Sequence, residues 1–496
     1  MPTRVPALLV LACLPLAPGF AQELEPDPLA PAPAQESPPP AVEQAEPPAE
    51  APSPPPKDEE PSPWRLSEAA GLPDWLHIGG THRTRYEYLW NQFRRGSPGN
   101  GRGLSLRTTI LLELRFQPLR IGAELLDSRA YFLDDDTPVN TGIVNPLELL
   151  QAYVALDLDQ ELGDAGKLTL RAGRLTFDIG SRRLVARNRF RNTINAFTGI
   201  HGEYERGGHS LQAFFVLPIQ RRPFDRDSLE DNDVHFDREH LDNHFWGLVY
   251  TSAPLSPAEL LVEAYLFGLN EDDRSERATR DRELYTTGFR LRRKKAKGEL
   301  DFQLEAVLQF GRSSLSSAAG ARRLDHFAYF AHATLGYTFA APMQPRLALQ
   351  GDYASGDTNP NDGDNGRFDT LFGARRFEFG PTGFFGAFAR SNIQSLGLRL
   401  ELKPLPKVSA HIAYRPFWLA RKKDAWTTSR VQDPAGRSGR FIGHQIEARV
   451  RWDLIPDNVR LEGGFALLAR GEFAREAPNA NAGEPLVVYS QLILKF

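Results

Sequence analysis

The feature that most constrains this chain is an alternation of apolar and polar residues that begins near Leu76 and recurs to the last residue. In the run 104–116, the even positions are mainly apolar, whereas Arg107, Glu113 and Arg115 occupy odd positions. Such a pattern predicts a β-strand with one apolar and one polar face. Many of the runs have ten to thirteen residues, enough to cross a bilayer at a tilt and longer than the usual strand of about five or six residues.

Eighteen such runs follow one another, and the connections between them alternate strictly between nine long and eight short segments. The runs are residues 76–90, 104–116, 119–127, 146–157, 167–177, 195–206, 209–218, 244–252, 258–269, 284–293, 298–310, 326–340, 345–354, 393–403, 407–417, 440–452, 458–470 and 486–496. Long outer loops and short periplasmic turns are typical of bacterial outer-membrane barrels. The sequence therefore predicts an all-β fold, a single 18-stranded antiparallel transmembrane β-barrel over residues 76–496, in the outer membrane of a Gram-negative bacterium.

The first 21 residues have the organisation of an export signal peptide. Arg4 precedes an apolar run over residues 5–16, and Gly19-Phe20-Ala21 fits a cleavage site. Cys13, the one cysteine of the chain, lies inside this segment, so we expect the mature chain to have no disulfide framework and no thiolate metal site. The tetrapeptide that ends at Cys13 leaves a lipoprotein box as an alternative.

Residues 22–75 precede the predicted barrel and differ from it in composition. Within residues 22–63 there are 15 prolines and ten acidic residues but one lysine. A segment of this kind cannot bury a core, and we expect a disordered, extended periplasmic spacer. After residue 21 no run of 18 consecutive apolar residues occurs, so the sequence offers no transmembrane helix.

The cost of burying charge in lipid decides which face of the strands points inward. An arginine that faces lipid at mid-bilayer costs about 2–4 kcal/mol, so a dozen of them would exceed a typical folding stability of about 5–15 kcal/mol. The polar face must therefore line the lumen, and its arginines include Arg83, Arg85, Arg107, Arg115, Arg171, Arg290, Arg399, Arg449 and Arg451. Two interpretations stay open: cross-strand ion pairs that brace a wide barrel, or a ladder of unpaired cations for an anionic solute.

The segment 167–206 combines two strand-like runs with a stretch dense in arginine. Its arginines are Arg171, Arg174, Arg182, Arg183, Arg187, Arg189 and Arg191. A basic run by itself is usually a solvated surface, whereas rings of arginine inside a pore select anions. We therefore predict that these residues line the solute pathway, and that the loops 178–194 and 355–392 fold into the barrel.

Three stretches of this sequence resemble the alginate export family of outer-membrane barrels. They are residues 148–154, residues 170–199 with their Gly-Arg, Arg-Leu and Phe-x-Gly spacings, and residues 351–380. The resemblance covers about residues 75–496. It implies an 18-stranded barrel whose arginine-lined constriction conducts a polyuronate, and it places the arginines of 167–206 in that electropositive pathway.

One predicted outer loop carries candidate metal ligands, Asp231, Asp233 and Asp237, among further acids and histidines. Oxygen ligands of this kind suit Ca²⁺, although a solvated polar loop is the simpler interpretation, and we expect no other cofactor. The sequence has no nucleophile elbow, no His-Glu-x-x-His and no phosphate-binding loop motif, so we expect no enzymatic activity.

These observations favour a passive outer-membrane channel that exports an anionic polysaccharide, an alginate-like polyuronate. The alternatives are a general or small-anion-selective porin and, with less support, an outer-membrane enzyme. We expect the partners to be the anionic solute, outer-membrane lipid and periplasmic secretion components that residues 22–63 could meet, and we expect no nucleic acid.

Overall fold

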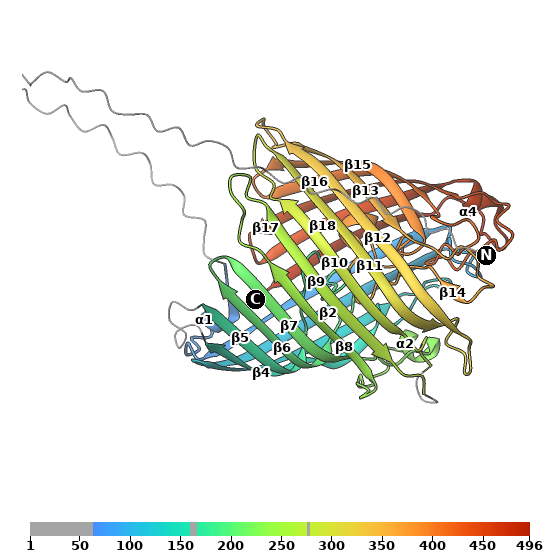
Figure 1. The fold of residues 1–496 in the computed structure, drawn as a ribbon. Coiled ribbons are helices and arrows are strands. Elements are labelled where there is room, and N and C mark those ends of the chain that lie inside the picture. The colour runs from blue at the N-terminus through green and yellow to red at the C-terminus, as the bar shows by residue number, and fades with distance from the viewer. Residues whose placement is uncertain (1–62, 159–165, 275–277) are drawn as a thin grey trace, which may run out of the picture. The chain divides into compact units, whose positions relative to one another are not determined.

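The computed structural model describes residues 63–158, 166–274 and 278–496. Within them, eighteen strands form one closed antiparallel sheet in which each strand pairs with the next one along the chain, and β19 pairs back with β1 (Figure 1). The short strand β14 (Asp364–Asn365) is not part of this wall, because it lies in a loop and pairs in parallel with β12. The predicted 18-stranded antiparallel barrel is confirmed.

Each of the eighteen predicted runs corresponds to one wall strand, with ends that differ by at most four residues. The strands are β1 (Leu76–Trp90), β2 (Gly101–Phe116), β3 (Leu119–Tyr131), β4 (Asn145–Leu158), β5 (Lys167–Leu175), β6 (Phe197–Arg206), β7 (His209–Pro218), β8 (Asn243–Thr251), β9 (Leu261–Glu271), β10 (Glu283–Arg293), β11 (Leu300–Ser314), β12 (Arg323–Thr338), β13 (Arg346–Ala354), β15 (Ile393–Leu405), β16 (Val408–Trp418), β17 (Phe441–Ile455), β18 (Val459–Arg470) and β19 (Leu486–Lys495). Short turns connect the strands at one end and long loops connect them at the other, which assigns the turns to the periplasm and the loops to the cell exterior.

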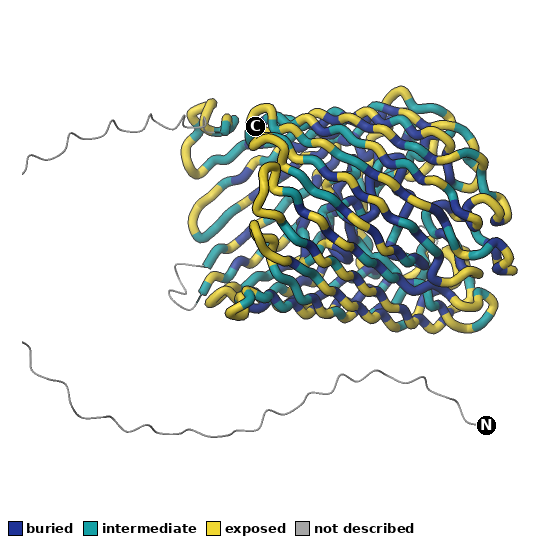
Figure 2. Tube along the Cα trace, turned by 90° about the horizontal axis from the view of Figure 1, so that it is seen from above, coloured by how far each residue is buried: buried dark blue, intermediate teal, exposed yellow. Residues whose placement is uncertain are grey.

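The two faces of the wall have opposite chemistry. On β11, Leu304 and Leu308 are 48% and 49% exposed, whereas Asp301 and Glu305 are 4% and 3% exposed. Figure 2 shows the same alternation of buried and exposed positions along the other strands. Apolar side chains therefore form the lipid-facing surface, and the charged face lines the lumen, as the cost of burying arginine in lipid predicts.

Helical structure in the described residues is confined to four short segments: α1 (Leu66–Ala69), α2 (Arg226–Glu230), α3 (Arg376–Phe379) and α4 (Glu472–Glu476). None of these helices is long and apolar enough to cross a membrane.

α1 lies inside the segment 22–75 that the sequence predicts to be disordered. Ser67 Oγ donates to the Ile78 carbonyl at 2.7 Å, and the Trp64 amide donates to Asn458 Oδ1 at 2.8 Å. These bonds hold residues 63–75 against the barrel, because their polar groups find partners on its periplasmic end. The predicted signal peptide and the Pro-rich residues 22–62 lie outside the described residues.

Two long loops, 178–194 and 355–392, fold into the outer end of the barrel, as the sequence predicts. They also bind each other, since the Phe372 amide donates to the Leu184 carbonyl at 2.8 Å. A Cβ at Gly373 would lie 1.7 Å from a backbone carbonyl oxygen of the other loop, so this close approach requires glycine. The two loops therefore act as one inserted unit.

An aromatic cluster packs between the inserted loops and the wall. Phe388 stacks on Phe417 of β16 with 3.6 Å between the ring centroids, and the indole N–H of Trp426 donates to the Ala387 carbonyl at 2.8 Å. Burial of a phenylalanine side chain contributes about 1.5–3 kcal/mol. A barrel of about 16–18 strands is wide enough for an aqueous channel, and here the loops turn its outer end into a packed core.

Candidate functional site

The barrel encloses a cavity of about 660 Å³, which we name the lumen cavity. Wall strands and both inserted loops line it. Its charged lining is strongly basic, because ten arginines and one lysine face two glutamates and one aspartate. The cations are Arg83, Arg107, Arg182, Arg187, Arg189, Arg376, Arg399, Arg449, Arg451, Arg460 and Lys495. A lining of this kind attracts anions and repels cations.

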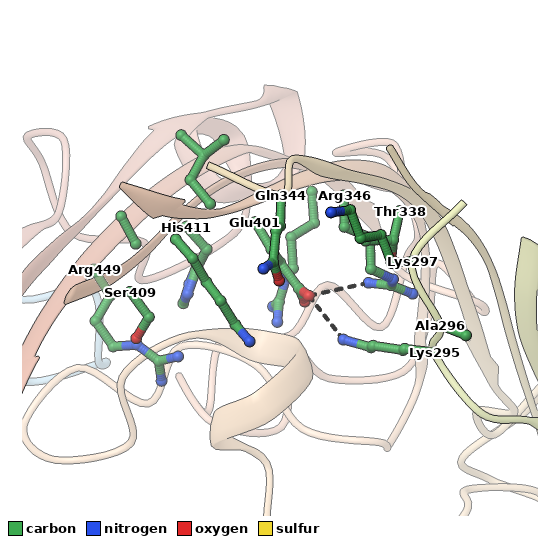
Figure 3. Close-up of a pocket in the computed structure, with 14 residues that line it drawn as sticks. Lys295, Ala296, Lys297, Thr338, Gln344, Arg346, Glu401, Ser409, His411 and Arg449 are labelled. Atoms are coloured by element: carbon green, nitrogen blue, oxygen red, sulfur yellow. Dashed lines mark hydrogen bonds and ion pairs between the residues drawn. The ribbon is translucent and has the colours of Figure 1, made fainter. Parts of the chain in front are cut away.

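A second cavity of about 420 Å³, the mouth cavity, lies among the periplasmic turns. Glu401 pairs with Lys295 at 2.7 Å and with Arg346 at 3.3 Å. Figure 3 shows both pairs, and Arg449 lies away from this group. Arg399 and Arg449 belong to the linings of both cavities. The basic surface is therefore continuous from the periplasmic turns into the lumen.

Three wall arginines hold the tip of the inserted loop 178–194 through its backbone. Arg83 and Arg107 donate to the Arg189 carbonyl at 3.1 and 2.9 Å. Arg85 donates to the Phe190 carbonyl at 2.8 Å, and its guanidinium lies 4.5 Å from the Phe190 ring centroid. Hydrogen bonds to a charged group contribute about 1.5–3 kcal/mol each, so β1 and β2 fix the loop tip firmly.

Two cations of the lumen cavity, Arg182 and Arg449, make no hydrogen bond or ion pair through their side chains within residues 63–158, 166–274 and 278–496. Arg182 has a φ of 63°, and its guanidinium lies 5.2 Å from the Phe377 ring centroid. The side chain of Arg189 is 72% exposed and lies 3.4 Å from Asp178. Unpaired guanidiniums keep their planar set of donors for a carboxylate solute.

Carboxylates only partly neutralise the remaining cations of the lumen cavity. Arg187 pairs with Glu124 at 2.6 Å, whereas Arg376 and Arg399 share the single carboxylate of Glu447 at 3.3 and 3.2 Å. The other pairs are Arg451–Glu462, Arg460–Asp453 and Lys495–Asp457. Sharing of Glu447 between two guanidiniums leaves a local excess of positive charge.

The sequence profile of the alginate export family matches residues 74–488. The chain belongs to the alginate export family. The match spans the whole wall from β1 to the start of β19. The comparison with curated proteins gives no match.

Solved outer-membrane proteins of Pseudomonas aeruginosa share the fold of this alginate export family member. OccK9 (OpdG) aligns with a TM-score of 0.53 and 14% identity over 85% of this chain and 98% of that chain. OpdK in its structure with vanillate aligns with a TM-score of 0.53 and 12% identity over 84% and 98%. OccK8 (OprE) aligns with a TM-score of 0.51 and 12% identity over 85% and 98%. The family and the shared fold identify an outer-membrane channel and indicate a channel rather than an enzyme.

Seven of the predicted pathway arginines lie outside the lumen cavity of this alginate export family barrel. They are Arg85, Arg115, Arg171, Arg174, Arg183, Arg191 and Arg290. Arg174 pairs with Glu148 at the outer rim of the barrel. Because side chains alternate along a strand, Arg174 leaves β5 on the face opposite to that of Arg171. The density of arginine in 167–206 therefore overstates how many of them face the solute.

Ion pairs within the wall account for two more of these residues. Arg290 pairs with Glu263 at 3.0 Å in the barrel interior, and Arg115 pairs with Glu113 at 2.6 Å near the periplasmic end. The Arg290 pair joins β10 to β9, as the bracing interpretation of the sequence predicts, whereas Arg115 and Glu113 lie two residues apart on β2. The inward arginines thus divide into braces and cavity-lining residues.

Arg183 joins the inserted loops to the wall, although the sequence predicts it as a pathway residue. It is 3% exposed and pairs with Glu305 of β11 and, at 2.6 Å, with Glu378 of α3. Glu378 also pairs with the fully buried Arg390. We name Arg183, Glu305, Glu378 and Arg390 the latch cluster. Because its members are buried and paired, the latch cluster fixes the loops rather than binding a solute.

The predicted site residues omit three cations of the lumen cavity: Arg376, Arg460 and Lys495. The alternation of the sequence already places Arg460 in the inward phase of its strand, and Lys495 occupies the same phase of β19. Arg376 lies in α3 of an inserted loop, and no local pattern indicates that it reaches the lumen.

The structure does not bring Asp231, Asp233 and Asp237 together as a metal site. Within the described ranges, no group of three or more His, Cys, Asp or Glu side chains is placed to hold a metal ion. Asp237 instead accepts a hydrogen bond from Asn145 Nδ2 at 2.9 Å and one from a backbone amide at 2.8 Å. Burial and the nearby Glu148 raise the pKa of Asp237 to about 6.

Proposed function

We propose that this outer-membrane channel passively exports an anionic polysaccharide, an alginate-like polyuronate, through its arginine-rich lumen. The lining of the lumen cavity carries the proposal, because its ten arginines and one lysine face three carboxylates in the lining and pair with only three more behind it, Glu447, Asp453 and Asp457. A polymer with regularly spaced carboxylates can pass along such a surface from one weak site to the next. Arg182 and Arg449, which have no ion pairs in the described chain, are the residues that we assign to direct contact with it.

The lumen cavity is continuous with the mouth cavity, which supports transport from the periplasm to the cell exterior. Arg399 and Arg449 line both, so a polymer that enters among the periplasmic turns meets a basic surface at once. Periplasmic secretion components that deliver the polymer would meet the channel at the mouth cavity.

A channel for small anions is the second candidate function, and the attachment of the inserted loops favours it. The latch cluster and the bonds from Arg83 and Arg107 hold these loops in the outer end of the barrel. A constriction with fixed loops would admit small solutes and exclude a polymer. The two candidates therefore differ in whether the loops move.

Single-channel recording in planar bilayers separates the two functions. We expect a polyuronate added on the side of the periplasmic turns to block the current at low concentration, because carboxylates compete with chloride for the unpaired guanidiniums. A neutral polysaccharide of equal length is the control and should leave the current unchanged. An anion-selective current that is indifferent to the polyuronate would contradict polymer export and support the small-anion channel.

A further inference from the structure

The outer loops form a third basic cavity, of about 330 Å³, which shares no lining residue with the lumen cavity. We name it the outer arginine pocket. Arg191, Arg221 and Arg375 line it together with Thr370 and Phe372, and its lining within the described chain includes no acidic residue. Its volume falls in the range of about 300–1,000 Å³ that is usual for small-molecule sites.

The three guanidiniums of the outer arginine pocket have no carboxylate partner among the described residues. Arg221 donates to the Thr141 carbonyl at 3.3 Å, to the Ile194 carbonyl at 3.4 Å and to Asn195 Oδ1, whereas Arg375 donates to the Phe388 carbonyl at 3.0 Å. Arg375 Nε is buried without a partner, and the side chain of Arg191 makes no hydrogen bond within the described ranges. The pocket therefore has free donors on Arg191 and Arg375 and no acidic residue in its described lining.

A neighbouring cavity of about 220 Å³ shows that this lack of pairing is not general in the outer loops. It shares Thr370 with the outer arginine pocket. There, Arg282 pairs with Asp369 at 2.9 Å, and Arg367 pairs with the fully buried Asp424. Arg282 and Arg367 of the neighbouring cavity thus have acidic partners, whereas the arginines of the outer arginine pocket do not.

Nearby like charges act on two cations of the outer arginine pocket, Arg191 and Arg375. Burial and the charges of Arg375 and Arg221 lower the pKa of Arg191 to about 9. Burial and the charges of Arg94 and Arg390 lower the pKa of Arg375 to about 10. The groups remain charged at neutral pH, and a bound anion would relieve the repulsion between them.

We propose that the outer arginine pocket is a binding site for the carboxylate of a uronate residue on the exterior side of the channel. Guanidinium forks match a carboxylate bidentately. The Thr370 side chain, which has no hydrogen bond in the described chain, can form a hydrogen bond with a sugar hydroxyl. The assignment rests on the proposed function for the identity of the anion, and it makes this pocket a contact for polymer that has passed the lumen.

Thermal unfolding of the full chain in detergent micelles tests this site apart from conduction. The probes are D-glucuronate, glucose and inorganic phosphate. We expect glucuronate to raise the midpoint temperature, because a ligand of the folded state stabilises it, and glucose to have no effect. Arg191→Gln and Arg375→Gln should raise the half-saturating glucuronate concentration by about tenfold, the usual loss for one charge-assisted contact.

The matched control is Arg280→Gln, because Arg280 lines the neighbouring cavity and its side chain also bonds to backbone carbonyls. Arg191→Lys, which keeps the charge but not the fork, should give an intermediate response and guards against a loss of folding in the glutamine variant. An equal glucuronate response in wild type, Arg191→Gln and Arg280→Gln would overturn the site. Stabilisation by phosphate but not by glucuronate would overturn the carboxylate assignment.

The outcomes also separate this site from the proposed function. A glucuronate response that depends on Arg191, in a channel that a polyuronate does not block, would contradict polymer export and retain the site. Block by the polyuronate with an unchanged glucuronate response in Arg191→Gln would retain export and overturn the site.

Discussion

Arg182 and Arg183 are neighbours in the sequence, yet they belong to two regions with opposite electrostatics. Arg183 is 3% exposed and lies in the latch cluster, where the carboxylates of Glu305 and Glu378 neutralise it. Arg182 lines the lumen cavity and has no ion pair within the described chain. The latch cluster is a region of buried, paired charge, whereas the lumen cavity is a region of excess charge.

The difference shows that the partners around it, more than residue type, decide what an arginine does in this barrel. Removing an ion from water costs several kcal/mol, so the buried Arg183 is held by two close carboxylates. Such an arginine is committed to holding structure together. A guanidinium that faces the lumen needs no protein partner and keeps its donors for a solute.

Breaking the latch cluster should cause the largest loss of folding stability. Arg183→Met removes the cation that Glu305 and Glu378 share and leaves two buried carboxylates without it. We expect the free energy of unfolding to fall by about 3–5 kcal/mol, measured by guanidinium-induced unfolding in detergent micelles. The control is Arg115→Met, whose half-exposed pair with Glu113 should contribute about 0–1 kcal/mol. Equal losses of unfolding free energy in the two variants would contradict the distinction between the buried pairs of the latch cluster and a half-exposed pair.

Releasing the tip of the loop 178–194 should cause the next largest loss of stability, together with a change in conductance. The side-chain nitrogen of Asn192 lies 2.8–3.2 Å from three carbonyl oxygens, and its oxygen accepts from Arg83 at 2.9 Å. Asn192→Ala should cost about 1–3 kcal/mol and increase the single-channel conductance, because the loop tip lines the lumen cavity. Asn361→Ala, in an exposed part of the other loop, should change neither quantity. Lower stability with unchanged conductance would show that the loop tip does not limit the current.

Removing a cation from the lumen should affect the solute without affecting the fold. Arg449→Gln deletes an unpaired guanidinium that lines both the lumen cavity and the mouth cavity. We expect block by a polyuronate to require about tenfold more polymer, since one charge-assisted contact is lost. The unfolding free energy should stay within about 0.5 kcal/mol of wild type. The matched control is Arg115→Gln, and an identical shift in both variants would refute the assignment of Arg449.

The smallest expected effect is the pH dependence of folding stability that arises in the outer loops. Burial and Glu148 raise the pKa of Asp237 to about 6, from an ordinary value near 4. The folded state therefore binds the proton more tightly than the unfolded state, so stability is greatest below about pH 4 and falls as the pH rises through 6. Asp237→Asn should remove this slope, on the order of 1 kcal/mol after solvent screening. Thermal midpoints of both proteins from pH 4 to 7 provide the check, and parallel curves would contradict it.

The wall of the barrel was predictable because one physical rule governs it. Lipid outside and water inside impose a period of two on the strands, which local register shifts interrupt in four of the strand pairs. The same rule places Arg460 in the lumen, and it would have separated Arg174 from Arg171 and included Lys495. The prediction for 167–206 used arginine density instead of phase, which explains why it includes Arg174.

The division of loop arginines into latch and pathway could not be predicted from the sequence. Arg183 is neutralised by Glu305 and Glu378, which lie more than a hundred residues away along the chain. Arg376 reaches the lumen only because its loop folds inward and binds the other loop through the approach at Gly373. These are tertiary contacts between loops, and no local periodicity encodes them.

The most direct test of the central claim is the reversal potential of the purified channel across a KCl gradient in planar bilayers. The account predicts an anion-selective potential for wild type, and a shift toward zero in the double variant Arg182→Gln, Arg449→Gln, with normal selectivity in Arg115→Gln. A cation-selective wild type, or a double variant whose reversal potential equals that of wild type, would contradict the claim that unpaired arginines of the lumen select the solute.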